Sequence, residues 1–294
     1  MLPRLGIGTA PLGGLFREVS EEDAAATVKA AAEAGIRYFD TAPRYGHGLA
    51  EERLGRTLGA VEEPVISTKT GWRLEPDGGA RADFSERGIR ESFESSLERL
   101  NRSSVDILYL HDPDEYADDI RRTGYQAVRK LRDEGLVRAI GFGMNHSAPL
   151  AAFVDEYDVD VVLIAGRFSL LDHDAMGTLL PLCRRRGTSV VVGGVFNTGL
   201  LADPNPAAMF NYRPVDPGAL ARAQRCGQLC ARYGVPLPAA AIQFPYLHPA
   251  VTSVVVGCRS AAEVTANVAA LEQPVPAELW QRLALEGFVP QSLV

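Results

Sequence analysis

The chain has 294 residues, of which 46% are hydrophobic and 23% are charged, a balance typical of globular proteins. Its 30 basic and 37 acidic residues give a formal net charge of −7, and the sequence contains no long basic run. These values argue against nucleic acid or an anionic membrane as the main partner, because both attract positively charged surfaces.

Cysteine usage and the N-terminus both favour a cytoplasmic protein. None of the four cysteines forms a Cys-x-x-Cys pair, and a chain of this length needs no disulfide staples. Cys226 and Cys230 share one face of a predicted helix, where core packing is the favoured role because no histidine pair stands near them. We therefore expect no metal site. Residues 1–6 lack the apolar region of a signal peptide, and no apolar run approaches the roughly 20 residues that span a bilayer.

Eight short apolar segments alternate with amphipathic segments along the chain. We predict strands at 5–9, 36–41, 64–69, 105–111, 137–143, 160–165, 188–193 and 252–257. Several are continuous runs of Val, Ile and Leu, which suit strands buried on both faces of a parallel sheet. Eight strand–helix repeats without a break in composition favour the α/β class and a single (β/α)₈ TIM barrel. We expect one barrel over residues 1–294, with 272–294 as a C-terminal extension.

The segments between the strands carry helix start signals. Ser20 lies three residues before Asp23, which is the spacing of a capping box, and Ser85 opens a long helix. Pro217 opens another helix. The stretch 197–217 is rich in Asn, Pro and Asp, and we expect it to be a long surface loop near the site.

The glycines of the first strand do not form a dinucleotide-binding loop of the Rossmann type. In 6–13 the third glycine is misplaced, and Pro11, Gly13 and Gly14 delay any helix to Ser20. No helix N-terminus is therefore in place to bind a pyrophosphate at this loop.

Four polar side chains are predicted to meet at one end of the barrel. Asp40, Lys69 and His111 come at or next to the C-terminal ends of three successive strands. Tyr45 lies in the loop after the first of these strands. Because the C-terminal strand ends form the active-site face of a barrel, we expect the four to form a catalytic site.

The chemistry of these four side chains suits proton transfer. The ammonium of Lys69 favours the phenolate form of Tyr45 and should lower its pKa, while Asp40 keeps the ammonium charged. His111 can donate a hydrogen bond to a carbonyl oxygen. None of the four can supply hydride, so redox chemistry at this carbon requires a nicotinamide cofactor. A Schiff-base mechanism at Lys69 is a rival, but it needs a neutral amine, and Asp40 opposes that state.

Sequence motifs around these residues resemble those of the aldo-keto reductase superfamily over nearly the whole chain. The matching motifs are the run 38–46, Glu52-Arg53-Leu54-Gly55, Thr68-Lys69 and Leu110-His111. The resemblance implies a (β/α)₈ barrel, NAD(P)(H) extended across the strand ends, and Tyr45 as acid or base. The stretches 5–13 and 165–168 are most similar to the sugar-oxidising branch, which includes D-threo-aldose 1-dehydrogenase, L-fucose dehydrogenase and pyridoxal dehydrogenase.

The resemblance also implies a set of cofactor contacts. The implied residues are Gly8, Thr9, Ala10, Asp40, Asn145, Phe196, Gly257, Arg259, Glu263 and Asn267. Asn145 matches the position that holds the nicotinamide carboxamide. Met144, Ala165 and Gly193 stand where many relatives have serine, glutamine and a stacking tyrosine. Phe196 is therefore expected to substitute as an apolar wall.

Charge near the last strand bears on the choice of cofactor. NADP-selective relatives place Lys and Arg on the adenosine 2′-phosphate in this region. Glu263 stands where an arginine is often found and would repel that phosphate, whereas it would tolerate ribose hydroxyls. We therefore expect NAD, with Arg259 leaving NADP open.

Four residues on loops at the same face are expected to line the substrate pocket. They are Phe16, His47, Trp72 and Asp112. Trp72 is placed to stack on a sugar face, and Asp112 and His47 to bond hydroxyl groups.

We expect an NAD(P)-dependent oxidation of an aldose of the L-fucose or D-arabinose type at C1, giving the lactone. The alternatives are a pyridoxal dehydrogenase, a general NADPH-dependent aldehyde reductase, and a cofactor-sensing regulatory subunit with the same fold. The expected partner is a small sugar or aldehyde. The oligomeric state is left open.

Overall fold

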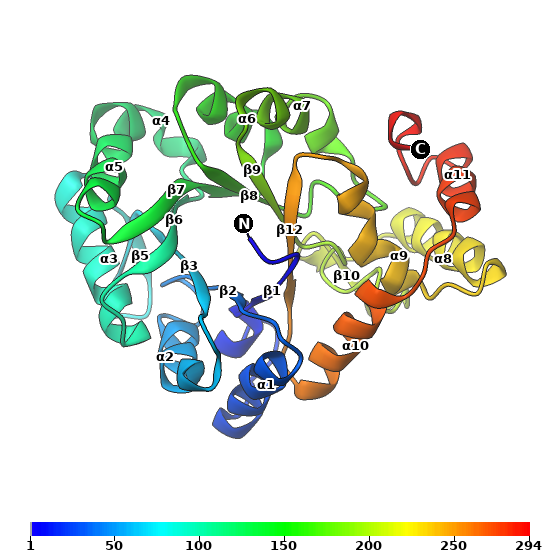
Figure 1. Cartoon of the computed structure of the whole chain (residues 1–294), viewed down its shortest axis with the longest axis horizontal. Helices are drawn as coiled ribbons and strands as arrows, with labels where there is room; N and C mark the ends of the chain where they lie inside the picture. Colours follow the sequence, from blue (N-terminus) through cyan, green and yellow to red (C-terminus); the bar gives the residue numbers. More distant parts are fainter. Residues whose placement is uncertain (1) are drawn as a thin grey trace.

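Eight parallel strands close into a barrel in the computed structural model, which describes residues 2–294 (Figure 1). The strands are β1 (Leu5–Gly8), β2 (Tyr38–Asp40), β3 (Val65–Thr70), β6 (Val105–His111), β7 (Val137–Met144), β8 (Val161–Ala165), β9 (Ser189–Gly193) and β12 (Val251–Gly257). Around the ring their order is β1-β12-β9-β8-β7-β6-β3-β2. All eight predicted strands and the (β/α)₈ barrel are therefore confirmed.

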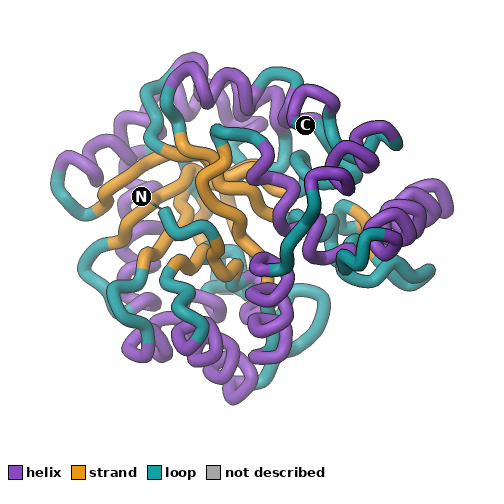
Figure 2. The backbone as a smooth tube through the Cα atoms, turned by 45° about the vertical axis from the view of Figure 1, so that its right-hand side comes forward, coloured by secondary structure: helices purple, strands orange, loops and turns teal. Residues whose placement is uncertain are grey.

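Helices surround the ring of strands (Figure 2). They are α1 (Glu21–Glu33), α2 (Leu49–Thr57), α3 (Glu86–Leu100), α4 (Ala117–Asp119), α5 (Tyr125–Asp133), α6 (Ser147–Glu156), α7 (Leu179–Arg186), α8 (Pro217–Arg232), α9 (Leu237–Gln243), α10 (Ala261–Glu272) and α11 (Ala277–Leu285). Short 3₁₀ and π turns lie at Ala10–Gly13, Leu58–Ala60, Asp114–Tyr116, Ile120–Gly124, Asp174–Met176, Phe244–Leu247 and Gln291–Leu293. No helix within residues 2–294 has both the length and the hydropathy of a membrane-spanning segment.

Side chains cap the helices where the sequence indicates. The Ser20 hydroxyl accepts a hydrogen bond from the Asp23 N–H at 3.0 Å, and Ser85 accepts one from Gly88 at the start of α3. Each bond satisfies a backbone donor that the first helical turn leaves without an intrahelical partner. The predicted starts of α1 and α3 are therefore confirmed.

The barrel interior is a separate hydrophobic cluster inside the main core. Its members are Tyr38, Ile107, Tyr109, Val161, Leu163, Val191 and Val255. Leu2 packs against this cluster, and in the view of Figure 1 the N-terminal segment crosses the centre of the ring of strands. The barrel is thus filled by side chains and is not a pore.

The stretch 197–217 is more ordered than the predicted loop. It contains a hairpin of β10 (Met209–Phe210) and β11 (Arg213–Pro214), joined by Asn211 and Tyr212 with φ of 49° and 64°. A two-residue hairpin turn with both φ values positive matches the twist of its strands, but the sequence lacks the glycine that usually signals it. A second hairpin pairs β4 (Trp72–Leu74) with β5 (Ala80–Ala82).

The chain beyond α10 lies outside the ring of strands, where α11 packs beside α8 (Figure 1). The Arg225 guanidinium on α8 donates to the Glu286 carboxylate at 2.6 Å, and Arg222 lies over the Phe288 ring. We propose that 272–294 is an extension of a single barrel unit. Cys226 and Cys230 on α8 are fully buried, as core residues.

Alanine at Gly55 should destabilise the fold, because its Cβ would lie 2.4 Å from the carbonyl oxygen of Arg99, where α2 meets α3. Such overpacking costs about 1–3 kcal/mol of the free energy of unfolding. Gly59→Ala is the matched control, since no described residue lies within 4 Å of a Cβ there. We expect urea titrations to show Gly55→Ala destabilised and Gly59→Ala within about 0.5 kcal/mol of wild type. Equal stability of the two variants would contradict the close packing of α2 on α3.

Candidate active site

The C-terminal ends of three neighbouring strands bring the predicted polar side chains together. Asp40 ends β2, Lys69 lies one residue before the end of β3, and His111 ends β6. Tyr45 follows β2 in the next loop, and its ring faces His111 edge-on, with centroids 6.0 Å apart. The structure thus brings all four residues to one face of the barrel.

Lys69 and Asp40 form a buried ion pair. The Lys69 ammonium donates to Asp40 Oδ2 and to the Thr41 carbonyl oxygen, each at 2.8 Å. Only 1% of Lys69 and 3% of Asp40 is exposed. Burial acts to lower the pKa of Lys69, but Asp40 and Tyr45 raise it above its ordinary value. The pKa shift and the ion pair with Asp40 favour the charged ammonium, which opposes the neutral amine of a Schiff-base mechanism.

The second oxygen of Asp40 is held from inside the barrel. The Ser67 hydroxyl donates to Asp40 Oδ1 at 2.7 Å, and the Tyr38 hydroxyl lies 3.1 Å from Ser67 Oγ. Tyr38 and Ser67 are both fully buried. With both carboxylate oxygens bonded, Asp40 is fixed in place, and the position of the ammonium is fixed with it.

The electrostatics of Tyr45 differ from the sequence-based expectation. The Lys69 ammonium nitrogen lies 4.6 Å from the centre of the Tyr45 ring. Loss of hydration nevertheless raises the pKa of Tyr45 to about 12, because it outweighs the lowering by Lys69. The expected net lowering of this pKa is wrong for the protein without cofactor. The sequence does not show how much water the folded chain removes from around Tyr45.

His111 is neutral in this setting. Burial lowers its pKa well below the ordinary value, and the positive charges of Lys69 and Arg44 lower it further. Its Nδ1 atom is buried and has no hydrogen-bond partner within residues 2–294. A neutral imidazole keeps one N–H donor, which can orient a substrate oxygen without adding charge.

A cavity of about 520 Å³ opens over this face. Tyr45, Lys69 and His111 line it, together with the expected contacts Ala10, Phe16, Asp112 and Asn145. Arg44 and Tyr212 are among the lining residues that the sequence did not indicate. Arg44 adjoins Tyr45 in sequence and could have been found from that position, whereas Tyr212 lies in the hairpin that was predicted as a loop.

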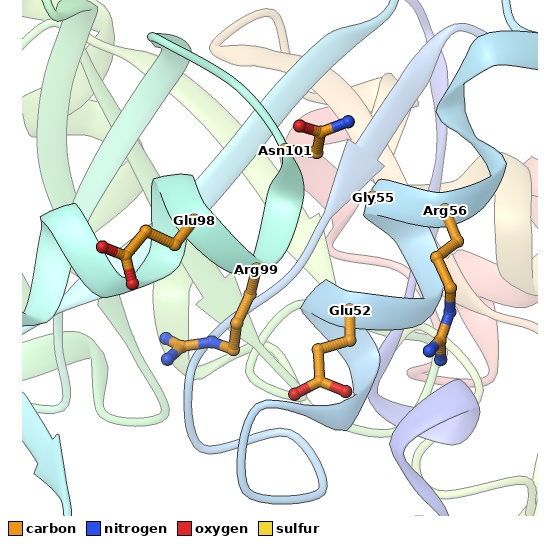
Figure 3. A pocket seen from close by; sticks show the side chains of 6 residues that line it. All are labelled: Glu52, Gly55, Arg56, Glu98, Arg99 and Asn101. Atoms are coloured by element: carbon orange, nitrogen blue, oxygen red, sulfur yellow. The ribbon is translucent and has the colours of Figure 1, made fainter.

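A second cavity, of about 490 Å³, lies between α2 and α3 (Figure 3). It is lined by Glu52, Gly55, Arg56, Glu98, Arg99 and Asn101. Both guanidinium groups already pair with carboxylates, Arg56 with Glu21 at 2.9 Å and Arg99 with Glu51 at 2.7 Å. None of the expected site residues lines this cavity, so we place the chemistry at the first one.

Two expected substrate contacts are not in the lining of the first cavity. The guanidinium of Arg44 lies 4.3 Å from the centre of the Trp72 ring and covers it, and the indole N–H donates to the His111 carbonyl oxygen at 2.7 Å. Trp72 therefore contacts Arg44 and His111, and its stacking on a sugar stays a prediction. His47 is exposed, with φ of 54°, and lies outside the lining.

Several expected cofactor contacts have structural roles. Gly8 and Thr9 are buried in the barrel wall, and the Thr9 hydroxyl donates to the Asp40 carbonyl oxygen at 3.1 Å. Thr9 therefore holds β2 near the ion pair. Phe196 is half-buried against the main hydrophobic core and is not in the cavity lining, and its role as an apolar wall for the cofactor stays a prediction.

The expected adenosine contacts gather where β12 passes into α10. Gly257 is exposed at the end of β12. The Arg259 guanidinium lies 3.2 Å from the Glu263 carboxylate, which also accepts the Arg259 backbone N–H at 2.9 Å. The Asn267 amide is buried and donates to Cys258 Sγ at 3.2 Å. Within residues 2–294, no three His, Cys, Asp or Glu side chains gather as a metal site.

The sequence and the fold of this chain are similar to those of known proteins. The model of the Aldo/keto reductase family matches residues 4–284. The chain is 40% identical to a D-threo-aldose 1-dehydrogenase of Pseudomonas sp, over 98% of this chain and 95% of the relative. It is 38% identical to a pyridoxal 4-dehydrogenase of Microbacterium luteolum, over 97% and 94%. A holo aldo-keto reductase from Bacillus halodurans superposes with a TM-score of 0.81 at 28% identity, over 98% of this chain and 92% of that one. The chain belongs to the aldo/keto reductase family of oxidoreductases.

Proposed function

We propose that this enzyme oxidises an aldose at C1 to the lactone, with NAD as the hydride acceptor and Tyr45 as the base. The observation that carries the proposal is the buried ion pair of Lys69 and Asp40 beside Tyr45, at the floor of an open cavity. Similarity to an aldose dehydrogenase supports the choice of substrate.

The cavity suits the ring of a nicotinamide. Gly143, Leu163 and Ala165 give it an apolar wall, of which Gly143 and Ala165 leave room for a ring, and Asn145 lies in the same lining. An amide such as that of Asn145 offers both a donor and an acceptor, which matches a carboxamide. When bound, the nicotinamide supplies the acceptor for the hydride that leaves C1.

Side chains of the protein then accept the proton that leaves the C1 hydroxyl and stabilise the charges that this transfer involves. The phenolate of Tyr45 takes the proton of the C1 hydroxyl as the carbon–oxygen double bond forms, and Tyr45 becomes a neutral phenol. The Lys69 ammonium stabilises the phenolate before transfer, and Asp40 keeps that ammonium charged and in place. The neutral imidazole of His111 is placed to donate a hydrogen bond to the C1 oxygen.

The Arg259–Glu263 pair supports the choice of NAD. Glu263 is fixed at the start of α10, where its N–H donates to Ser260 Oγ at 3.3 Å and its carboxylate reaches back to the Arg259 N–H. The carboxylate therefore neutralises Arg259 and places a negative charge where a 2′-phosphate would need a positive one.

Two measurements test the proposed function. The first assays L-fucose, D-arabinose, L-galactose, pyridoxal and simple aldehydes, with NAD and NADP in parallel, and identifies the substrate. The second uses Tyr45→Phe, which should lose the oxidation activity. We expect aldose-dependent NADH formation, and a fall in kcat of roughly 10²–10⁴-fold in Tyr45→Phe because the proton acceptor is lost. Intact activity in this variant would refute the role of Tyr45. Turnover of pyridoxal alone, or of aldehydes with NADPH alone, would support the alternative substrates, and no turnover would support a regulatory role.

The oxidation rate should rise with pH. Because the pKa of Tyr45 is raised to about 12, the phenolate is a minor species at neutral pH, and its fraction grows about tenfold per pH unit. We therefore expect log kcat/KM for oxidation to rise with a slope of about one across the alkaline range in which the enzyme stays folded. The reverse reduction needs the protonated phenol and should be insensitive over the same range. A flat oxidation profile would contradict Tyr45 as the titrating base.

Glu263→Gln should shift cofactor preference toward NADP. The substitution leaves the capping geometry available, since Gln also serves in a capping box, but it removes the charge opposite Arg259. We expect the ratio of kcat/KM for NAD to that for NADP to fall about tenfold, equivalent to roughly 1.4 kcal/mol. Glu272→Gln, at the far exposed end of α10, should leave the ratio unchanged. An unchanged ratio in Glu263→Gln would show that this pair does not set the preference.

A further inference from the structure

Two exposed aromatic rings meet at the active-site cavity. Phe16 and Tyr212 stack with their centroids 6.0 Å apart and their planes 28° apart. They remain 51% and 58% exposed, and both belong to the lining of the cavity that holds Tyr45. We name this pair the aromatic bridge, since one ring comes from the loop after β1 and the other from the hairpin after β9.

Both residues of the aromatic bridge have an unfavourable backbone conformation, with positive φ. Phe16 has φ of 70° and Tyr212 has φ of 64°, in the left-handed region that L side chains rarely adopt. Tyr212 also occupies the second position of a two-residue hairpin turn, where glycine is favoured. Folding alone gives no reason for an aromatic residue at this position, so the ring is better explained by binding.

Each arm of the aromatic bridge is anchored. The Tyr212 N–H donates to Thr198 Oγ1 at 3.1 Å, and the buried Asn197 accepts a hydrogen bond from the Ser169 hydroxyl at 2.6 Å beneath the hairpin. On the other side, a Cβ at Gly13 would come within 2.7 Å of the Tyr45 carbonyl group, so the loop that carries Phe16 packs directly on the Tyr45 backbone. Both arms are therefore held close to the site and are not free loops.

A charged rim completes the cavity beside the aromatic bridge. The Arg44 guanidinium lies 3.6 Å from the Asp112 carboxylate, which also accepts a hydrogen bond from the Asn145 amide at 3.2 Å. Partial loss of hydration in the cavity raises the pKa of Tyr212, and the negative charge of Asp112 raises it further while Lys69 lowers it. The phenol of Tyr212 therefore lies within electrostatic reach of both the rim and the catalytic ammonium.

We propose that the aromatic bridge is a specificity-determining roof, which binds the C–H face of a ring-closed aldose while Arg44 and Asp112 bind its hydroxyl groups. This inference rests on the proposed function and names the form of the substrate. A pyranose ring presents an apolar face of C–H groups and a polar edge of hydroxyls, and the cavity offers the same two surfaces side by side. A short open-chain aldehyde has the reacting carbon but no such face.

Tyr212→Gly separates this role from a role in folding. Glycine accepts the φ of 64° without strain, so the melting temperature should stay the same or rise. The KM for L-fucose should rise about tenfold, because the stacking surface is lost. The KM for glyceraldehyde, measured in reduction with NADH, should change less than twofold, and so should the Kd for NADH measured by fluorescence titration. Tyr233→Ala, which removes a tyrosine that is 40% exposed at the end of α8, should change none of these values.

Three outcomes would contradict the proposed role of the aromatic bridge. An unchanged KM for L-fucose in Tyr212→Gly would show that the ring does not contact the sugar. An equal rise in KM for glyceraldehyde would show that it does not select ring-closed substrates. An equal weakening of NADH binding would assign the aromatic bridge to the cofactor. In each case wild-type oxidation of L-fucose leaves the proposed function standing, whereas a wild-type enzyme that oxidises no aldose refutes the proposed function and the roof together.

Discussion

The buried ion pair between Lys69 and Asp40 is the interaction on which the account of this enzyme depends. A charge held in the protein interior is costly unless a partner and further hydrogen bonds compensate for its lost hydration. Here the compensation comes from the Thr41 carbonyl oxygen on one side and from Ser67 on the other. The barrel thus holds a fixed positive charge beside Tyr45, and the same burial that strengthens the field of this charge also raises the pKa of the phenol.

This arrangement links the fold to the chemistry. Asp40 ends β2 and Lys69 lies one residue before the end of β3, and these two strands are hydrogen-bonded neighbours, so their pairing brings the two charges together. The interior cluster adds Tyr38, whose hydroxyl supports Ser67. In the proposed mechanism, residues of the barrel interior set the electrostatics of Tyr45, and residues on the loops at the mouth of the cavity select the substrate.

Much of the fold could be predicted from the sequence, because continuous Val, Ile and Leu runs mark strands that are buried on both faces. The grouping of Asp40, Lys69 and His111 could be predicted because all three come at or next to strand ends, a position that sequence order reveals. The contact of Arg44 with the Trp72 ring could not be predicted, because nothing in the sequence shows that the two side chains meet. Tyr212 was missed because its hairpin turn lacks glycine, and the pKa of Tyr45 was misjudged because hydration depends on packing between distant segments.

The most direct test of the central claim is the single-turnover rate of aldose oxidation in Lys69→Met. The substitution keeps the length and bulk of the side chain but removes the charge beside Tyr45. We expect hydride transfer to be slower by roughly a hundredfold or more, with the Kd for NADH within about twofold of wild type. A rate within about threefold of wild type would contradict the claim, because Tyr45 would then act without the ammonium.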